Sequence, residues 1–87
     1  MAWSVYILTC CDGTLYTGIA LDTQKRFALH VSGCGARYTK IHPPLRIEYT
    51  LDGFTHREAL RIEAQIKKLP KHKKVASLKN YTLDRKG

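Results

Sequence analysis

Three deficits in the sequence limit what this chain can be. It has seven Asp and Glu against fifteen Lys and Arg, a formal net charge of +8 over 87 residues. Its cysteines, Cys10, Cys11 and Cys34, are odd in number and form no C-x-x-C pair, so they predict no disulfide framework. The apolar run at residues 3–9 is too short to span a bilayer and follows no Lys or Arg. We therefore expect a cytoplasmic protein with reduced thiols, no signal peptide and no membrane span.

The positive charge is concentrated in the last third of the chain. Residues 57–87 hold ten Lys and Arg and three Asp and Glu, whereas residues 1–56 carry a net charge of only +1. A basic region of this kind indicates a polyanionic partner, most simply nucleic acid. The alternative interpretation is a solvated helical surface.

Runs of β-branched and aromatic residues predict three strands, and two segments with capping and stop signals predict helices. The strands are expected over 3–9, 14–20 and 45–51, the helices over 23–32 and 56–69, and a short basic helix over 71–79. The order β-β-α-β-α-α predicts an α+β fold, a small antiparallel three-stranded sheet flanked by helices. We expect one domain over 1–80 and a flexible basic tail over 81–87. In the third strand the alternation places Leu45, Ile47, Tyr49 and Leu51 on one face.

The first two strands meet around an Asp-Gly turn signal that allows two registers. A two-residue loop would put Tyr6 and Tyr16 on opposite faces of the sheet. A three-residue loop at residues 11–13, with Gly13 in the left-handed conformation, would put both on one face and Gly18 opposite Tyr6. Only the second register gathers the apolar residues onto the other face, so we prefer it. Gly18 would then leave room for a ring or a substrate.

Two helical positions stand out chemically. Glu63 falls in the arc of helix 56–69 that should face the sheet, beside Ala59. A carboxylate there needs an ion pair, for which an Arg is the ordinary partner, or a metal ion. Arg26 and His30, spaced i, i+4, share one face of the first helix and combine a phosphate-binding group with a proton-transfer group.

These residues resemble the functional positions of the GIY-YIG nuclease superfamily. VYIL at 5–8 and YTG at 16–18 resemble the two half-motifs of that family, with Ser4-Val5-Tyr6 in place of Gly-Ile-Tyr and Tyr-Thr-Gly in place of Tyr-Ile-Gly. The segment GCGARYTK at 33–40 resembles the GARYT segment of its small stand-alone bacterial members. The matching residues, in chain order, are Tyr6, Tyr16, Gly18, Arg26, His30 and Glu63.

The resemblance implies a divalent-metal-dependent endonuclease that hydrolyses DNA phosphodiester bonds, structure-selective in repair or recombination, with one Mg²⁺ or Mn²⁺ ion. Glu63 would bind the metal and Arg26 would stabilise the transition-state charge. Tyr6 would accept or steer the proton of the attacking water, and Tyr16 and His30 would orient that water or share the proton relay. A free phenol has a pKa near 10, so nearby cations such as Arg26, Lys40 and the metal would have to lower the pKa of Tyr6.

Further contacts with nucleic acid are expected from the basic residues around this centre. Together with Gly18, the predicted contacts are Arg37, Lys40, Lys67, Lys68, Lys71, Lys73 and Lys74. A protein partner could supply substrate specificity. Two alternatives stay open, a non-catalytic nucleic-acid-binding module that stacks bases on Tyr6 and Tyr16, and an interaction domain of a larger complex.

Overall fold

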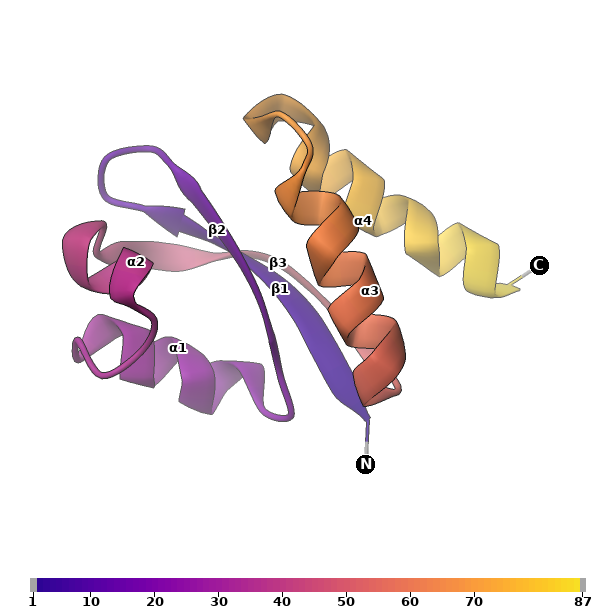
Figure 1. The fold of residues 1–87 in the computed structure, drawn as a ribbon, viewed down its shortest axis with the longest axis horizontal. Helices are drawn as coiled ribbons and strands as arrows, with labels where there is room; N and C mark the ends of the chain where they lie inside the picture. Colours follow the sequence, from indigo (N-terminus) through magenta and orange to yellow (C-terminus); the bar gives the residue numbers. More distant parts are fainter. Residues whose placement is uncertain (1, 87) are drawn as a thin grey trace.

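Three strands form one antiparallel sheet in the order β2-β1-β3, and four helices flank it (Figure 1). The structure, a computed structural model, describes the backbone of residues 2–86 and the side chains through Tyr81. The elements are β1 Trp3–Cys10, β2 Leu15–Ala20, α1 Thr23–Val31, α2 Arg37–Ile41, β3 Pro44–Phe54, α3 His56–Lys67 and α4 Lys71–Lys86. The α+β class is confirmed, and α2 is an additional short helix that the sequence pattern did not predict.

The turn between β1 and β2 is the three-residue loop. The Cys10 N–H donates to the Thr14 carbonyl at 2.8 Å, and the Gly13 N–H donates to the Cys10 carbonyl at 2.9 Å. Gly13 has φ 84°, a left-handed conformation that glycine adopts without a steric cost. The resulting register places Tyr6 and Tyr16 on the same face of the sheet, as predicted.

The two faces of the sheet carry different cores. On one face Val5 and Ile7 pack with buried residues of α3 and α4, including Ile66 and Leu78. On the other face Tyr6, with Leu8 and Ala20, packs beneath α1. Figure 1 shows this division, with α1 and α2 on one side of the sheet and α3 and α4 on the other.

The prediction that alternate residues of 45–51 share one face is wrong. Ile7 pairs with Tyr49, but the next residue, Leu8, pairs with Ile47, so β3 has one extra residue at this point. This bulge turns Ile47 towards the Tyr6 face while Tyr49 stays on the α3 side. An alternating pattern cannot reveal such a shift, because the shift depends on the partner strand.

Side-chain caps begin helices α1 and α3, in line with the capping signals in the sequence. Asp22 accepts from the Lys25 N–H at 3.1 Å and caps α1. Thr55 and Glu58 form a reciprocal capping box at the start of α3.

The last helix, α4, continues to residue 86, beyond the end near residue 79 that the sequence suggested. The division into a domain over 1–80 and a flexible tail over 81–87 stays a prediction, and Gly87 lies outside the described residues. No helix within residues 2–86 is long and apolar enough to cross a bilayer.

Candidate active site

A buried phenol and a buried imidazole meet beneath α1. Tyr6, in the middle of β1, and His30, in the last turn of α1, are each 1% exposed. Their Oη and Nε2 atoms lie 2.9 Å apart. Gly18 on β2 pairs with Tyr6, and a Cβ added there would overlap the phenol, coming within 2.5 Å of its Cζ. The absent side chain of Gly18 therefore leaves space that the Tyr6 ring itself fills.

The segment at residues 35–39 encloses the other side of the imidazole. His30 Nδ1 lies 2.7 Å from the buried Oγ1 of Thr39, which donates to the Ala36 carbonyl at 2.8 Å. Gly35 packs so closely on the ring that an added Cβ would lie 2.9 Å from its Cγ and overlap Nδ1. The sequence predicted no role for Gly35, Ala36 or Thr39, and their only signal was their place in the segment GCGARYTK.

Tyr16, on β2, connects this buried pair to the surface. Its ring centroid lies 6.4 Å from that of Tyr6 and 5.3 Å from that of His30. On its other side it stacks with Tyr38 of α2 at 5.6 Å, and Tyr38 stacks with His42 at 4.4 Å. All three outer rings are half-buried, so part of each faces solvent. The i, i+4 spacing of Tyr38 and His42 was a visible but weak sequence signal.

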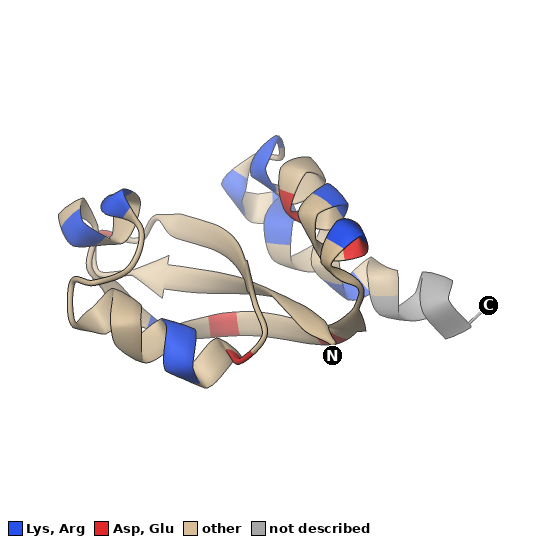
Figure 2. Ribbon diagram, turned by 60° about the horizontal axis from the view of Figure 1, so that its bottom comes forward, with Lys and Arg blue, Asp and Glu red and all other residues tan. Residues whose placement is uncertain are grey.

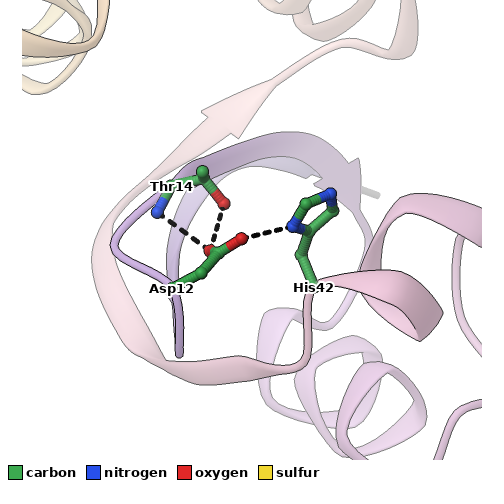
Figure 3. A network of polar contacts seen from close by, with 3 residues as sticks. All are labelled: Asp12, Thr14 and His42. Atoms are coloured by element: carbon green, nitrogen blue, oxygen red, sulfur yellow. Dashed lines mark hydrogen bonds and ion pairs between the residues drawn. The ribbon is translucent and has the colours of Figure 1, made fainter.

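Contacts with the β1–β2 turn hold this row of rings in place. Asp12 pairs with His42 Nδ1 and also accepts from the backbone N–H and the hydroxyl of Thr14, at 3.1 and 2.7 Å (Figure 3). The hydrogen bonds of Thr14, and then that of His42, lower the pKa of Asp12 to about 2. The Asp12 carboxylate therefore stays ionised and ties the end of α2 to the hairpin. We refer to Asp12, Thr14 and His42 as the clasp.

Glu63 lies on α3, and its charge acts on the Tyr6 phenol. Its side chain is 20% exposed, and Oε2 lies 3.5 Å from the ammonium of Lys67, one turn along α3. The same ammonium lies 5.7 Å from the centroid of the Tyr16 ring. Glu63 is thus a partly buried carboxylate beside the tyrosines, paired with a lysine where an arginine was the expected ordinary partner.

The candidate metal ligand is a single carboxylate, Glu63. No three His, Cys, Asp or Glu side chains converge anywhere among the described residues. Glu63 is the carboxylate whose charge acts on the Tyr6 phenol. Mg²⁺ is commonly held by one or two carboxylates, with water and substrate phosphate oxygens completing its shell. The Lys67 ammonium, 3.5 Å from Oε2 of Glu63, competes with a metal ion for this carboxylate and would have to turn away for the ion to bind.

The expectation that nearby cations lower the pKa of Tyr6 is wrong for this structure. Burial, followed by the neighbouring Tyr16, raises the pKa of Tyr6 to about 12. Arg26 acts in the opposite direction and Glu63 adds to the increase, while Lys40 is not among the groups that act on the phenol. Burial outweighs Arg26 because the phenolate loses more solvation than one guanidinium restores.

His30 is also kept uncharged. Burial, and then the positive charge of Arg26, lower the pKa of the imidazole. At neutral pH the pair therefore consists of a neutral phenol and a neutral imidazole that share one hydrogen bond. Arg26 is itself exposed at the surface of α1 and influences both groups.

The predicted nucleic-acid contacts divide into two groups. Lys67 and Lys74 line an open pocket of about 400 Å³ with Tyr16 and Tyr38, although Lys74 donates to the carbonyls of Ile66 and Lys67 at the end of α3. The remaining predicted basic contacts are exposed on α2 and around the junction of α3 and α4, where Figure 2 shows the basic residues of these elements. They are Arg37, Lys40, Lys68, Lys71 and Lys73.

The fold and this cluster have known counterparts. A family model described as the GIY-YIG catalytic domain matches residues 2–76. The UPF0213 protein H16_B0156 of Cupriavidus necator is 44% identical over 75 residues, covering 86% of this chain and 82% of the relative. The UPF0213 protein SSP2268 of Staphylococcus saprophyticus is 45% identical over 71 residues, covering 82% and 87%.

Two solution NMR structures are similar as well. The UPF0213 protein BH0048 from Bacillus halodurans has a TM-score of 0.55 and 39% identity, covering 91% of this chain and 84% of that one. The protein EF2693 from E. faecalis has a TM-score of 0.63 and 34% identity, covering 95% and 88%.

The family-model match over residues 2–76 identifies a catalytic domain of the nuclease type, and the two tyrosines that share one face of the sheet lie within it. The chain belongs to the GIY-YIG family, among its small single-domain members related to the UPF0213 proteins. Membership implies nuclease-type activity on a nucleic acid, and the family's nucleases generally use divalent metals.

Proposed function

We propose that this protein is a divalent-metal-dependent endonuclease that hydrolyses DNA phosphodiester bonds. The observation that carries the proposal is the buried Tyr6–His30 hydrogen bond, close to a carboxylate, Glu63, and a guanidinium, Arg26. A proton-transfer pair, a metal ligand and an anion-binding group are the parts that phosphodiester hydrolysis requires.

The raised pKa of Tyr6 argues against a free phenolate as the base. Instead, the Tyr6 oxygen takes a proton from the attacking water as Tyr6 passes its own hydroxyl proton to His30 Nε2. The water oxygen bonds to phosphorus, the bond from phosphorus to the 3′ oxygen breaks, and the leaving oxygen takes up a proton from solvent. His30 then returns its extra proton to solvent through Tyr6.

The other site residues act on charge and orientation. Arg26 stabilises the negative charge that develops on the phosphate, because a guanidinium binds phosphate oxygens in a bidentate fashion. Tyr16, between Tyr6 and the solvent-exposed rings, orients the attacking water. Glu63 would hold one Mg²⁺ or Mn²⁺, which when bound supplies positive charge to the phosphate and the leaving oxygen.

The test is a cleavage assay on linear, flapped and branched DNA with and without Mg²⁺. We expect the wild-type protein to cut only with the metal, and Glu63→Gln to lose at least about 10²-fold in rate, as is typical when one charge-stabilising group is removed. Glu48→Gln removes a carboxylate from the exposed side of β3, next to Arg46, and is the matched control. Equal cleavage by wild type and Glu63→Gln would contradict the proposal.

A second candidate, a nucleic-acid-binding module without catalysis, is supported by the stacked rings of Tyr16, Tyr38 and His42, since aromatic rows bind unstacked bases. Tyr6 cannot contribute to such a row, because its side chain is buried. Under this candidate Tyr38→Ala would weaken DNA binding, and no variant would show metal-dependent cleavage.

A further inference from the structure

The side chain of Thr39 occupies an unusual position for a surface-helix threonine. It lies on the short helix α2, is 1% exposed, and places its single hydroxyl between His30 Nδ1, at 2.7 Å, and the Ala36 carbonyl, at 2.8 Å. A hydroxyl carries only one hydrogen. Thr39 can therefore donate to only one of these two neighbours and must accept from the other, or leave one contact unmade.

Two arrangements of hydrogens are possible along this chain of groups. In the first, Tyr6 donates to Nε2, Nδ1 carries a hydrogen and donates to Thr39, and Thr39 donates to Ala36. In the second, Nε2 carries the hydrogen and donates to Tyr6, Thr39 donates to Nδ1, and the Thr39–Ala36 bond is lost. The first arrangement makes one more hydrogen bond, from the buried Thr39 hydroxyl to the partly buried Ala36 carbonyl, and is therefore favoured.

We propose that Thr39 is a positioning residue that fixes His30 in the tautomer with a hydrogen on Nδ1 and a free lone pair on Nε2. This inference rests on the proposed function, in which His30 takes the proton of Tyr6. In that tautomer the O–H bond of Tyr6 breaks as an N–H bond forms at Nε2, and the oxygen of Tyr6 gains the proton of the attacking water. In the other tautomer Nε2 already carries a hydrogen and cannot accept one.

The same placement stabilises the product of the transfer. Once His30 is protonated on both nitrogens, Nδ1–H still donates to Thr39 and Nε2–H donates to the oxygen of Tyr6, so neither buried donor lacks an acceptor. The backbone supports this arrangement. The Thr39 N–H also donates to the Ala36 carbonyl, at 3.1 Å, and Gly35 packs directly against the imidazole ring.

The tautomer can be measured without any reaction. In ¹⁵N-histidine-labelled protein, two-bond ¹H–¹⁵N correlations distinguish a ring nitrogen that carries a hydrogen from one that does not, and His30→Gln identifies the signals of this residue. We expect Nδ1 of His30 to carry the hydrogen in the wild type. Thr39→Val, which keeps the shape but removes the hydroxyl, should move the hydrogen to Nε2, and Thr39→Ser should restore it to Nδ1.

Cleavage rates test the consequence of the tautomer. We expect Thr39→Val to lower kcat by roughly 10²-fold, the scale of a general acid–base contribution, with little change in KM, and Thr39→Ser to recover most of the rate. A merely structural role for Thr39 would change stability without moving the tautomer. The backbone amide spectrum of each variant shows whether it is folded.

Two outcomes would overturn the inference. One is a wild-type His30 that carries its hydrogen on Nε2, or a Thr39→Val protein in which the hydrogen stays on Nδ1. The other is a tautomer that moves in Thr39→Val while kcat stays the same. Failure of the proposed function can be distinguished from failure of this inference. If the protein is not a nuclease, neither the wild type nor any variant cuts DNA, but the NMR measurement still shows which tautomer of His30 Thr39 selects.

Discussion

At the scale of single residues, the site depends on a phenol that is difficult to ionise. The pKa of Tyr6 is raised to about 12, chiefly by burial, from an ordinary value of 10. A group whose pKa is higher in the folded state stabilises the fold at pH values below its unfolded pKa. This contribution is lost as the pH rises from about 10 to about 12.

The titration of Tyr6 gives a direct prediction. Between pH 10 and 12 we expect the free energy of unfolding of the wild type to fall by roughly 2 kcal/mol relative to that of Tyr6→Phe, which has no group to ionise. Absorbance of the phenolate should show a tyrosine that ionises near pH 12, and this transition should be missing in Tyr6→Phe. Tyr49→Phe, on the other face of the sheet, should retain it. Ionisation of Tyr6 near its ordinary pKa of 10 would contradict the structure.

Two glycines show why this site needs small residues as well as reactive ones. Gly18 and Gly35 lie against the rings of Tyr6 and His30, and a Cβ at either position would overlap a ring atom. The sequence identified Gly18 through its place opposite Tyr6 in the hairpin. Gly35 gave no such signal, because its closeness to His30 comes from a loop packing on a helix and not from a strand register.

At the scale of elements, α2 is held in place from two sides. Thr39 contacts His30 of α1, and His42, the C-cap residue of α2, joins Asp12 of the β1–β2 turn (Figure 3). A helix of five residues has too few internal hydrogen bonds to be stable alone. These tertiary contacts therefore determine where Tyr38 lies relative to Tyr16.

The clasp can be tested with a single substitution. Asp12→Asn removes the charge that pairs with His42, so we expect the amides of residues 38–42 to exchange hydrogen several-fold faster than in the wild type, as measured by NMR. In the wild type, the low pKa of Asp12 means that the stabilisation by this carboxylate is complete above pH 4 and is lost as the pH falls through about 2.

The matched control for the clasp is Asp22→Asn, which makes the same change at the N-cap of α1. Asn caps a helix about as well as Asp does, so the amides of α2 should exchange as in the wild type. Unchanged exchange at residues 38–42 in Asp12→Asn would mean that the clasp does not hold α2.

The elements also show which features a sequence can predict. The hairpin register followed from Gly13 and from the apolar face it creates, and α3 began at its Thr55–Glu58 capping box. These signals are local. Helix α2 was missed because its N-cap, Ala36, makes no side-chain capping bond, and Ile47 was placed on the wrong face because a bulge depends on the partner strand.

The same limit applies to the candidate site. Motif and helix position selected five candidate site residues, Tyr6, Tyr16, Arg26, His30 and Glu63. In the structure His30 hydrogen-bonds to the Tyr6 phenol, and the charges of Tyr16, Arg26 and Glu63 shift the pKa of that phenol. Thr39 was not recognised, because a threonine in a short polar segment has no distinctive pattern. The pKa of Tyr6 was predicted in the wrong direction, because burial is a property of the folded chain.

At the scale of the whole molecule, a formal charge of +8 on 87 residues dominates encounters with nucleic acid. Lys and Arg residues lie on α2 and around the junction between α3 and α4 (Figure 2), and Lys67 and Lys74 line the open pocket beside Tyr16. Each phosphate neutralised by a lysine releases condensed counterions. The logarithm of the binding constant for duplex DNA therefore falls by about 0.9 per contact for each tenfold increase in salt concentration.

Lys71 is the most informative residue for measuring this effect. It is exposed, and its ammonium lies 3.7 Å from where a Cβ of Gly13 would be, so it extends from α4 to the tip of the hairpin. We expect Lys71→Gln to reduce the salt slope of duplex binding by about 0.9, measured by fluorescence anisotropy over a range of salt concentrations. The control, Lys79→Gln, makes the same charge change on the same helix. The Lys79 ammonium lies over the ring of Tyr49 on β3, 5.5 Å from the ring centroid. We therefore expect the salt slope of Lys79→Gln to match that of the wild type. Equal slopes for the two variants would show that the net charge alone, and not a surface centred on the hairpin tip and α2, drives binding.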